Sequence, residues 1–172
     1  MILTGSEIQT AFANGDIMIS PFEAELVNPN SYNYRLGTSI KKWVGQKNGQ
    51  NVFESIILPK DGYVLDPHIM YLGNTYETIG SDQYAMSLIG RSSLGRLGLF
   101  LQISANLGHT TSCHKWTLEI VATRPIRIYP QMKIGQVSFW ENKGDLLPST
   151  FTYANYNEPQ ESILIPGMER IL

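Results

Sequence analysis

Two arginines and two serines lie close together in one glycine-rich stretch of this sequence. The stretch spans 88–99 and reads LIGRSSLGRLGL, and its polar side chains are Arg91, Ser92, Ser93 and Arg96. Arginine stays charged near neutral pH and can place two N–H groups on phosphate oxygens, while serine hydroxyls add further hydrogen bonds. The glycines allow backbone N–H groups to approach a ligand closely. These residues predict a site for a phosphorylated small molecule.

A carboxylate, Glu119, follows in the sequence WTLEIV at 116–121. Its neighbours Leu118 and Ile120 are apolar, so on an alternating strand the glutamate points to the opposite face. A carboxylate that takes a proton from water and returns it to a leaving group can catalyse hydrolysis. On this pattern alone, Glu119 is equally an ordinary solvent-facing strand residue.

The composition indicates a single folded domain with a small ligand. The chain has 172 residues, of which 42% are hydrophobic and 16% charged, which excludes a disordered chain, and no apolar run reaches the about 20 residues that span a bilayer. The single Cys113 cannot form an internal disulfide, and the first residues lack the pattern of a signal peptide, so we expect a cytoplasmic protein. A net charge of −2 argues against nucleic-acid polymers as partners.

Short strands must position these residues. Residues 6–14 predict a helix, with Thr4 or Ser6 as its N-cap and Gly15 as its end. Strands are predicted at 17–21, 32–36, 40–44, 52–58, 63–65, 69–76, 85–89, 97–104, 116–122, 126–129 and 135–140, with a hairpin loop at 45–51. This spacing favours a sandwich, jelly roll or barrel. We expect a domain at 1–146 and a C-terminal arm or lid at 147–172.

Several stretches together resemble the dCTP deaminase family of the dUTPase-like superfamily. GRSSLGRLGL at 90–99 resembles its phosphate-binding motif, and TLEI at 117–120 resembles the strand of its catalytic glutamate, at matching separation. NPNSYNYRLG at 28–37 is similar to its N-terminal Pro-x-Ser-x-Asp-x-x-Leu-Gly segment, and IYPQMKIGQVSF at 128–139 to its late strand pair. The resemblance covers roughly residues 1 to 145.

The resemblance implies a mainly β fold, a distorted jelly roll or β-barrel of the dUTPase-like type with a short N-terminal helix. It also implies a homotrimer whose active sites are shared between subunits. The implied activity is hydrolytic deamination of dCTP to dUTP, with further hydrolysis to dUMP left open. Mg²⁺ is expected as the companion of the triphosphate.

The same resemblance assigns roles to individual residues. Arg91, Ser92 and Ser93 would hold the triphosphate, and Glu119 would be the general base. Ser92, Arg96 and the carbonyl of Ala105 would position the attacking water beside it. In the C-terminal arm, Tyr153 and Tyr156 are candidates to close over the nucleotide, although a packing role is equally open.

One turn departs from the family pattern. The family typically has an Asp-Pro-Gly-aromatic turn that contacts the deoxyribose region, but this chain has NLGHTTSCHK at 106–115, with His109 at the position of the aspartate. A neutral imidazole brings no fixed negative charge, so sugar recognition and the choice of substrate stay open. Two milder departures are Asn33 in place of aspartate and Gln131 in place of a turn glycine.

Metal-dependent mechanisms and metal sites fit the sequence poorly. Zinc deaminases need His-x-Glu and a later Pro-Cys-x-x-Cys, which one cysteine cannot supply, so no protein-bound zinc is expected. His109, Cys113 and His114 suit zinc by type, but their spacing matches no familiar site and a fourth ligand is missing.

Two other functions stay open. One is a dUTPase-like nucleoside triphosphate pyrophosphatase, in which water attacks phosphorus, and His109 in place of aspartate counts against it. The other is a catalytically silent, nucleotide-binding regulatory trimer that keeps the fold and the anion site.

Overall fold

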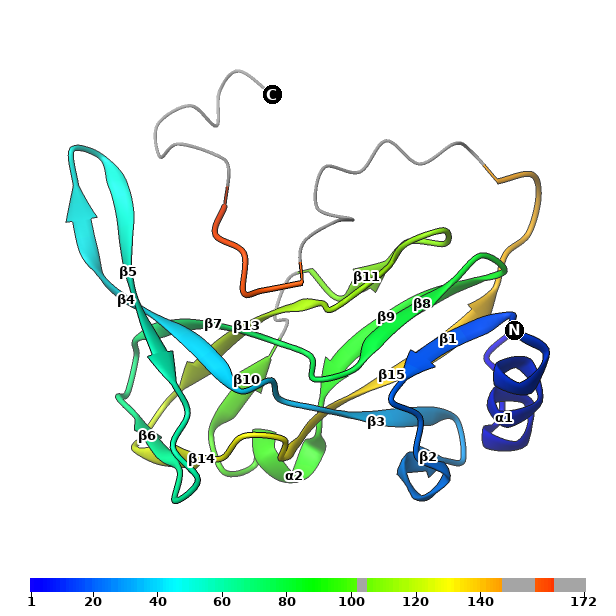
Figure 1. Ribbon diagram of the computed structural model, residues 1–172, viewed down its shortest axis with the longest axis horizontal. Helices are drawn as coiled ribbons and strands as arrows, with labels where there is room; N and C mark the ends of the chain where they lie inside the picture. Colours follow the sequence, from blue (N-terminus) through cyan, green and yellow to red (C-terminus); the bar gives the residue numbers. More distant parts are fainter. Residues whose placement is uncertain (102–104, 147–156, 163–172) are drawn as a thin grey trace.

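The computed structural model describes residues 1–101, 105–146 and 157–162 of a mainly β protein (Figure 1). One five-stranded antiparallel sheet, the β9 sheet, has the order β11 (Leu107–Gly108), β9 (Tyr84–Gly90), β15 (Lys133–Glu141), β3 (Ser31–Arg35) and β2 (Val27–Asn28). A second, the β13 sheet, has the order β10 (Leu99–Leu101), β13 (Thr117–Ala122), β7 (Met70–Asn74), β4 (Ser39–Lys47) and β5 (Gln50–Ile57). The predicted mainly β fold with a short N-terminal helix is confirmed.

Two smaller sheets and three short helices complete the described fold. The smaller sheets are β1 (Ile17–Ser20), β8 (Thr78–Ser81) and β12 (Cys113–His114), and β6 (Tyr63–Leu65) with β14 (Ile126–Ile128). The helices are α1 (Gly5–Asn14), the 3₁₀ turn η1 (Ala24–Leu26) and α2 (Ser92–Gly95). No helix in the described ranges is long and apolar enough to cross a membrane.

Apolar residues at alternate strand positions create one hydrophobic core that the two main sheets share. In β13, Leu118, Ile120 and Ala122 are fully buried, and they share a hydrophobic cluster with Tyr34 and Phe139 of the β9 sheet. Because successive strand residues point to opposite faces, Thr117, Glu119 and Val121 lie on the other face of the β13 sheet. The position of the predicted base is therefore set by the apolar residues beside it.

The N-terminal helix follows its predicted signals. The Thr4 hydroxyl accepts a hydrogen bond from the backbone N–H of Glu7 at 3.4 Å, and Gly15 ends the helix with φ +83°. Ile8 and Ala11 are buried against the core. The prediction of this helix from its cap residues and apolar face is confirmed.

The hairpin loop predicted at 45–51 is wrong, because the strands continue almost to its tip. β4 and β5 pair as far as Lys47 and Gln50, so only Asn48 and Gly49 form the turn. Both have positive φ, +54° and +77°, which matches the tight turn that suits strand twist. Gly45, with φ +129°, lies at a register shift rather than in a loop. The long β4–β5 hairpin extends away from the rest of the sheet (Figure 1).

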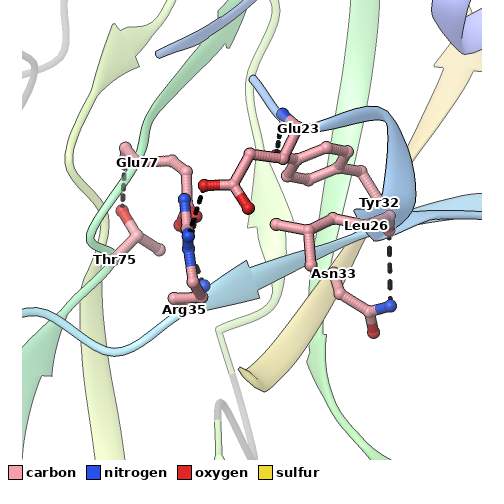
Figure 2. A network of polar contacts seen from close by, with 7 residues as sticks. All are labelled: Glu23, Leu26, Tyr32, Asn33, Arg35, Thr75 and Glu77. Carbon is pink, nitrogen blue, oxygen red and sulfur yellow. Dashed lines mark hydrogen bonds and ion pairs between the residues drawn. The ribbon is translucent and has the colours of Figure 1, made fainter. Parts of the chain in front are cut away.

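A partly buried ion network joins the two main sheets (Figure 2). Arg35, at the end of β3, donates from Nε to Glu77 at 2.6 Å and from Nη1 to Glu23 at 2.6 Å. Thr75 continues the network, because its hydroxyl donates to the Glu77 carbonyl at 2.7 Å and accepts from the Trp116 N–H at 2.9 Å. The network therefore ties the β9 sheet to the residue that precedes β13.

Candidate active site

The four predicted phosphate-binding residues lie together on one turn. β9 ends at Gly90, Arg91 has an extended backbone, and the chain then makes the short helix α2, which the sequence analysis did not predict. Ser92, Ser93 and Arg96 are exposed on this turn, and Arg91 is half-buried. The turn presents two cations and two hydroxyls at the surface, which is a suitable donor set for a phosphate group.

Backbone hydrogen bonds fix the shape of this turn. The N–H of Arg96 donates to the Ser92 carbonyl at 3.1 Å, and the N–H of Leu94 donates to the Arg91 carbonyl at 3.0 Å. Arg124 anchors the following residues, since its Nε donates to the Leu97 carbonyl at 2.7 Å. A long contact of 3.5 Å joins Arg91 Nη1 to the Lys133 carbonyl. The two arginines of the turn therefore belong to a backbone that several hydrogen bonds hold in place.

Glu119 lies in the middle of β13 and is half-buried. It is paired with Leu72 of β7, and Leu72 is paired on its other side with Lys41 of β4. Directly paired residues share a face of the sheet. The predicted base therefore lies on the same face as Lys41, with one strand between them.

The predicted phosphate ligands and the predicted base belong to different parts of the chain. β10 begins at Leu99, which pairs with Ala122 at the end of β13, so α2 lies beyond that end of the strand. Glu119 is three residues further along, a displacement of about 10 Å at the usual strand rise. The pairing of β10 with β13 therefore places Glu119 on the face of the β13 sheet. It places Arg96 and the rest of the α2 turn beyond the end of β13.

Ala105 and His109 lie beside the other sheet. They flank β11, which pairs with Ser87 and Met86 of β9, and both are exposed. His109 begins a turn closed by a 3.3 Å hydrogen bond from the Ser112 N–H to its carbonyl. The predicted site residues therefore divide into Glu119 on the β13 sheet and the others near β9, while Tyr153 and Tyr156 lie outside the described residues.

The alternative metal cluster is not formed by the described residues. Cys113 and His114 are neighbours on β12, so their side chains point to opposite faces. Cys113 is exposed, whereas His114 is buried and packs against the Trp116 ring at 4.2 Å between centroids. Within the described ranges, no three His, Cys, Asp or Glu residues are grouped to hold a metal ion.

The two milder departures have local structural roles. Asn33 is buried, and its Nδ2 donates to Asn28 Oδ1 at 3.0 Å. The same Nδ2 donates to the Leu26 carbonyl at 3.3 Å (Figure 2). Gln131 has φ +58°, the left-handed conformation that favours glycine. The turn geometry expected for a glycine is therefore kept at Gln131 although the residue has changed.

Residues 157–162, which belong to the expected C-terminal arm or lid, contact the Glu119 face through residues that the sequence analysis did not name. The Gln160 N–H donates to the Thr117 hydroxyl at 3.1 Å, and Glu161 forms an ion pair with Lys41 at 2.8 Å. The sequence analysis predicted a strand at 40–44, which includes Lys41, but gave this lysine no role. Nothing in the local pattern indicated which strands would be its neighbours.

The chain is similar to proteins of one family along most of its length. The sequence model of the dCTP deaminase-like family matches residues 2–142. A dUMP-forming dCTP deaminase of Clostridium botulinum (strain Alaska E43 / Type E3) is 38% identical over 99% of this chain and 100% of that protein. One of Hathewaya histolytica, also dUMP-forming, is 39% identical over 98% and 100%, and a dCTP deaminase of Rhodopirellula baltica is 38% identical over 95% and 84%.

A solved structure supports the fold independently of close sequence similarity. The crystal structure of 2′-deoxycytidine 5′-triphosphate deaminase from Agrobacterium tumefaciens has a TM-score of 0.67 and 20% sequence identity to this chain. The likeness covers 82% of this chain and 48% of that chain, so this chain spans about half of its length. From the family match and the full-length relatives together, the chain belongs to the dCTP deaminase-like family.

Proposed function

We propose that this protein deaminates dCTP by hydrolysis. Water adds to C4 of the cytosine ring and ammonia leaves, so that dCTP and water give dUTP and ammonia. The observation that carries the proposal is similarity along nearly the whole chain to proteins named dCTP deaminases. The arginines and serines around α2 and the half-buried Glu119 on β13 support it.

Glu119 would move the protons of this reaction. One carboxylate can accept a proton from the attacking water and return it to the ring nitrogen or the departing amine. Arg91, Ser92 and Ser93 would hold the triphosphate, and Arg96, Ser92 and the Ala105 carbonyl would orient the water. In this proposal the binding energy of the phosphates positions the base of the nucleotide for reaction.

Mg²⁺ would accompany the triphosphate in this proposal. The side chains grouped on the α2 turn are cations and hydroxyls, which suit phosphate oxygens rather than a bare cation. Mg²⁺ usually keeps several waters and binds substrate phosphates. We therefore assign it to the nucleotide and give it no role in removing the amino group.

We also propose that two copies of the chain share each site within a homotrimer. The register that places Glu119 three residues inside β13 and α2 beyond its end supports this arrangement. Apolar side chains near these elements are exposed, Leu97 by 48% and Phe100 by 42%. A second copy that brings its α2 turn to the Glu119 face would cover such residues.

A second step, release of pyrophosphate to leave dUMP, is favoured by the names of several relatives, which are dUMP-forming. His109 opposes this step, because an imidazole lacks the fixed negative charge of the aspartate typical of the family. The two products are distinguished by measuring pyrophosphate beside ammonia.

The test is a product assay with dCTP, dCMP and dUTP, with and without Mg²⁺. We expect ammonia from dCTP, with little from the Glu119→Gln variant. Glu54→Gln is the matched control, because Glu54 is an exposed glutamate of the same sheet, and it should leave the rate unchanged. Pyrophosphate without ammonia would identify a pyrophosphatase, and tight binding with neither product would identify a regulatory protein.

A further inference from the structure

Residues 157–162 form a short strap across the face of the β13 sheet that carries Glu119. Besides the Gln160 contact with Thr117 of β13, Asn157 accepts hydrogen bonds at 3.2 Å from Asn74 Nδ2 of β7 and from the Lys115 N–H. Pro159, within the strap, is buried. The strap therefore contacts β13, β7 and the segment leading into β13.

The charged contact of the strap involves Lys41 on β4. Lys41 Nζ lies 2.8 Å from Glu161 Oε1, with side-chain exposures of 26% and 38%. Lys41 and Glu119 are each paired with Leu72, one from either side. The ion pair thus fixes the end of the strap two strands away from Glu119, about 10 Å at the usual strand spacing.

We propose that Lys41 and Glu161 are positioning residues whose ion pair holds the 157–162 strap closed over the Glu119 face. A closed strap would retain the nucleotide and limit the access of bulk water to Glu119. The pair acts on closure and not on proton transfer, so its loss should raise KM more than it lowers kcat. This step rests on the proposed function, whereas closure itself can be measured without a substrate.

The size of the effect follows from the exposure of the pair. Ion pairs between partly exposed side chains contribute little and are screened by salt. Reversing one charge also adds repulsion between like charges, so we expect about two- to five-fold more opening of the strap. An effect of this size is readily measured by hydrogen exchange.

The chain offers a matched control one residue away. Lys42 forms an ion pair with Asp66 at 2.6 Å, with side-chain exposures of 25% and 52%. Because consecutive strand residues point to opposite faces, this pair lies away from the strap. Lys42→Glu changes the net charge of the protein as Lys41→Glu does, without touching Glu161.

The experiment compares Lys41→Glu, Glu161→Lys, their double variant and Lys42→Glu in the full chain. Hydrogen exchange of the Gln160 amide, measured without nucleotide, reports closure because this N–H donates to Thr117. We expect faster exchange and a higher KM for dCTP in each single variant at position 41 or 161. The double variant should restore both values, and Lys42→Glu should change neither.

Two results would overturn the proposal. One is exchange at Gln160 that is unchanged in both single variants, and the other is a double variant that is no better than the singles. If the wild-type protein releases no ammonia from dCTP, the proposed function fails, but the exchange measurement still decides whether the ion pair closes the strap. The two failures are therefore distinguishable.

Discussion

Arg35 binds both carboxylate oxygens of Glu77, with its Nε donating to Oε1 at 2.6 Å and its backbone N–H donating to Oε2 at 2.8 Å (Figure 2). Glu77 is fully buried. Arg35 Nη1 reaches Glu23, while its buried Nη2 has no partner among the described residues. The carboxylates of Glu77 and Glu23 therefore offset most of the free-energy cost of burying the Arg35 guanidinium.

The first prediction concerns the removal of Glu77, the buried partner of Arg35. Glu77→Ala leaves the Arg35 guanidinium largely buried with one carboxylate, that of Glu23, to neutralise it, and breaking a buried pair in this way costs about 3–5 kcal/mol. We expect the free energy of unfolding in urea to fall by that amount. Glu54→Ala, at an exposed position, should change it by less than about 0.5 kcal/mol. A fall below about 1 kcal/mol for Glu77→Ala would contradict the assigned role.

The second prediction concerns the backbone at Gln131. Its φ of +58° costs a residue with a side chain about 1 kcal/mol or more, although glycine also loses more entropy on folding. Gln131→Gly should therefore raise the free energy of unfolding, by about 1 kcal/mol. Gln131→Ala keeps the Cβ and should give no such gain. Thermal unfolding of the wild-type protein and the two variants tests this prediction. A lower unfolding midpoint for Gln131→Gly than for the wild-type protein would show that the positive φ does not destabilise the turn.

Alkaline pH should unfold the protein through its buried tyrosines. Burial raises the pKa of Tyr34 well above its usual range, and burial is the main cause that raises the pKa of Tyr32 to about 12. A phenol whose pKa is raised on folding stabilises the protein fully below the unfolded pKa of about 10, and this stability is lost as the pH rises through the folded pKa. We expect stability to fall between about pH 10 and 12.

Tyrosinate absorbance and circular dichroism, recorded together against pH, test this expectation. Ionisation of the buried tyrosines and loss of strand signal should coincide. Tyr34→Phe removes one buried phenol and should make the pH dependence in this window less steep. If all nine tyrosines ionised near pH 10 while the fold stayed intact, burial would not control their ionisation.

Local patterns predicted the longer strands and the N-terminal helix, but not the short strands β2, β8, β11 and β12 or the neighbours of each strand. Alternation around Glu119 and the cap at Thr4 act within a few residues, so the sequence indicates them directly. The proximity of Lys41 to the Glu119 strand depends on the order of strands in the sheet, which long-range pairing decides. A charged residue such as Glu77 gives no local sign of burial, because its partner Arg35 lies far away in the sequence.

The turn at His109 gives a prediction about products. His109→Asp introduces the fixed negative charge typical of the family at an exposed position in a turn that a backbone hydrogen bond closes. A hydrogen bond to a charged group contributes about 1.5–3 kcal/mol, so the ratio of pyrophosphate to ammonia should rise by about ten-fold or more. His109→Asn, which is uncharged, is the control. An unchanged ratio in the aspartate variant would show that this turn does not govern the second step.

Mixing two inactive proteins tests whether sites are shared between copies. Glu119→Gln lacks the proposed base, and Arg96→Ala lacks a cation of the α2 turn; each alone should lose about 10²-fold or more of the ammonia release. If each site takes Glu119 from one copy and Arg96 from the next, mixed trimers contain some sites in which both residues are intact. Unfolding and refolding the two variants together should then restore a substantial fraction of the activity. If each site lies within one chain, every site in the mixture carries a defect, and activity should stay at the level of the separate variants.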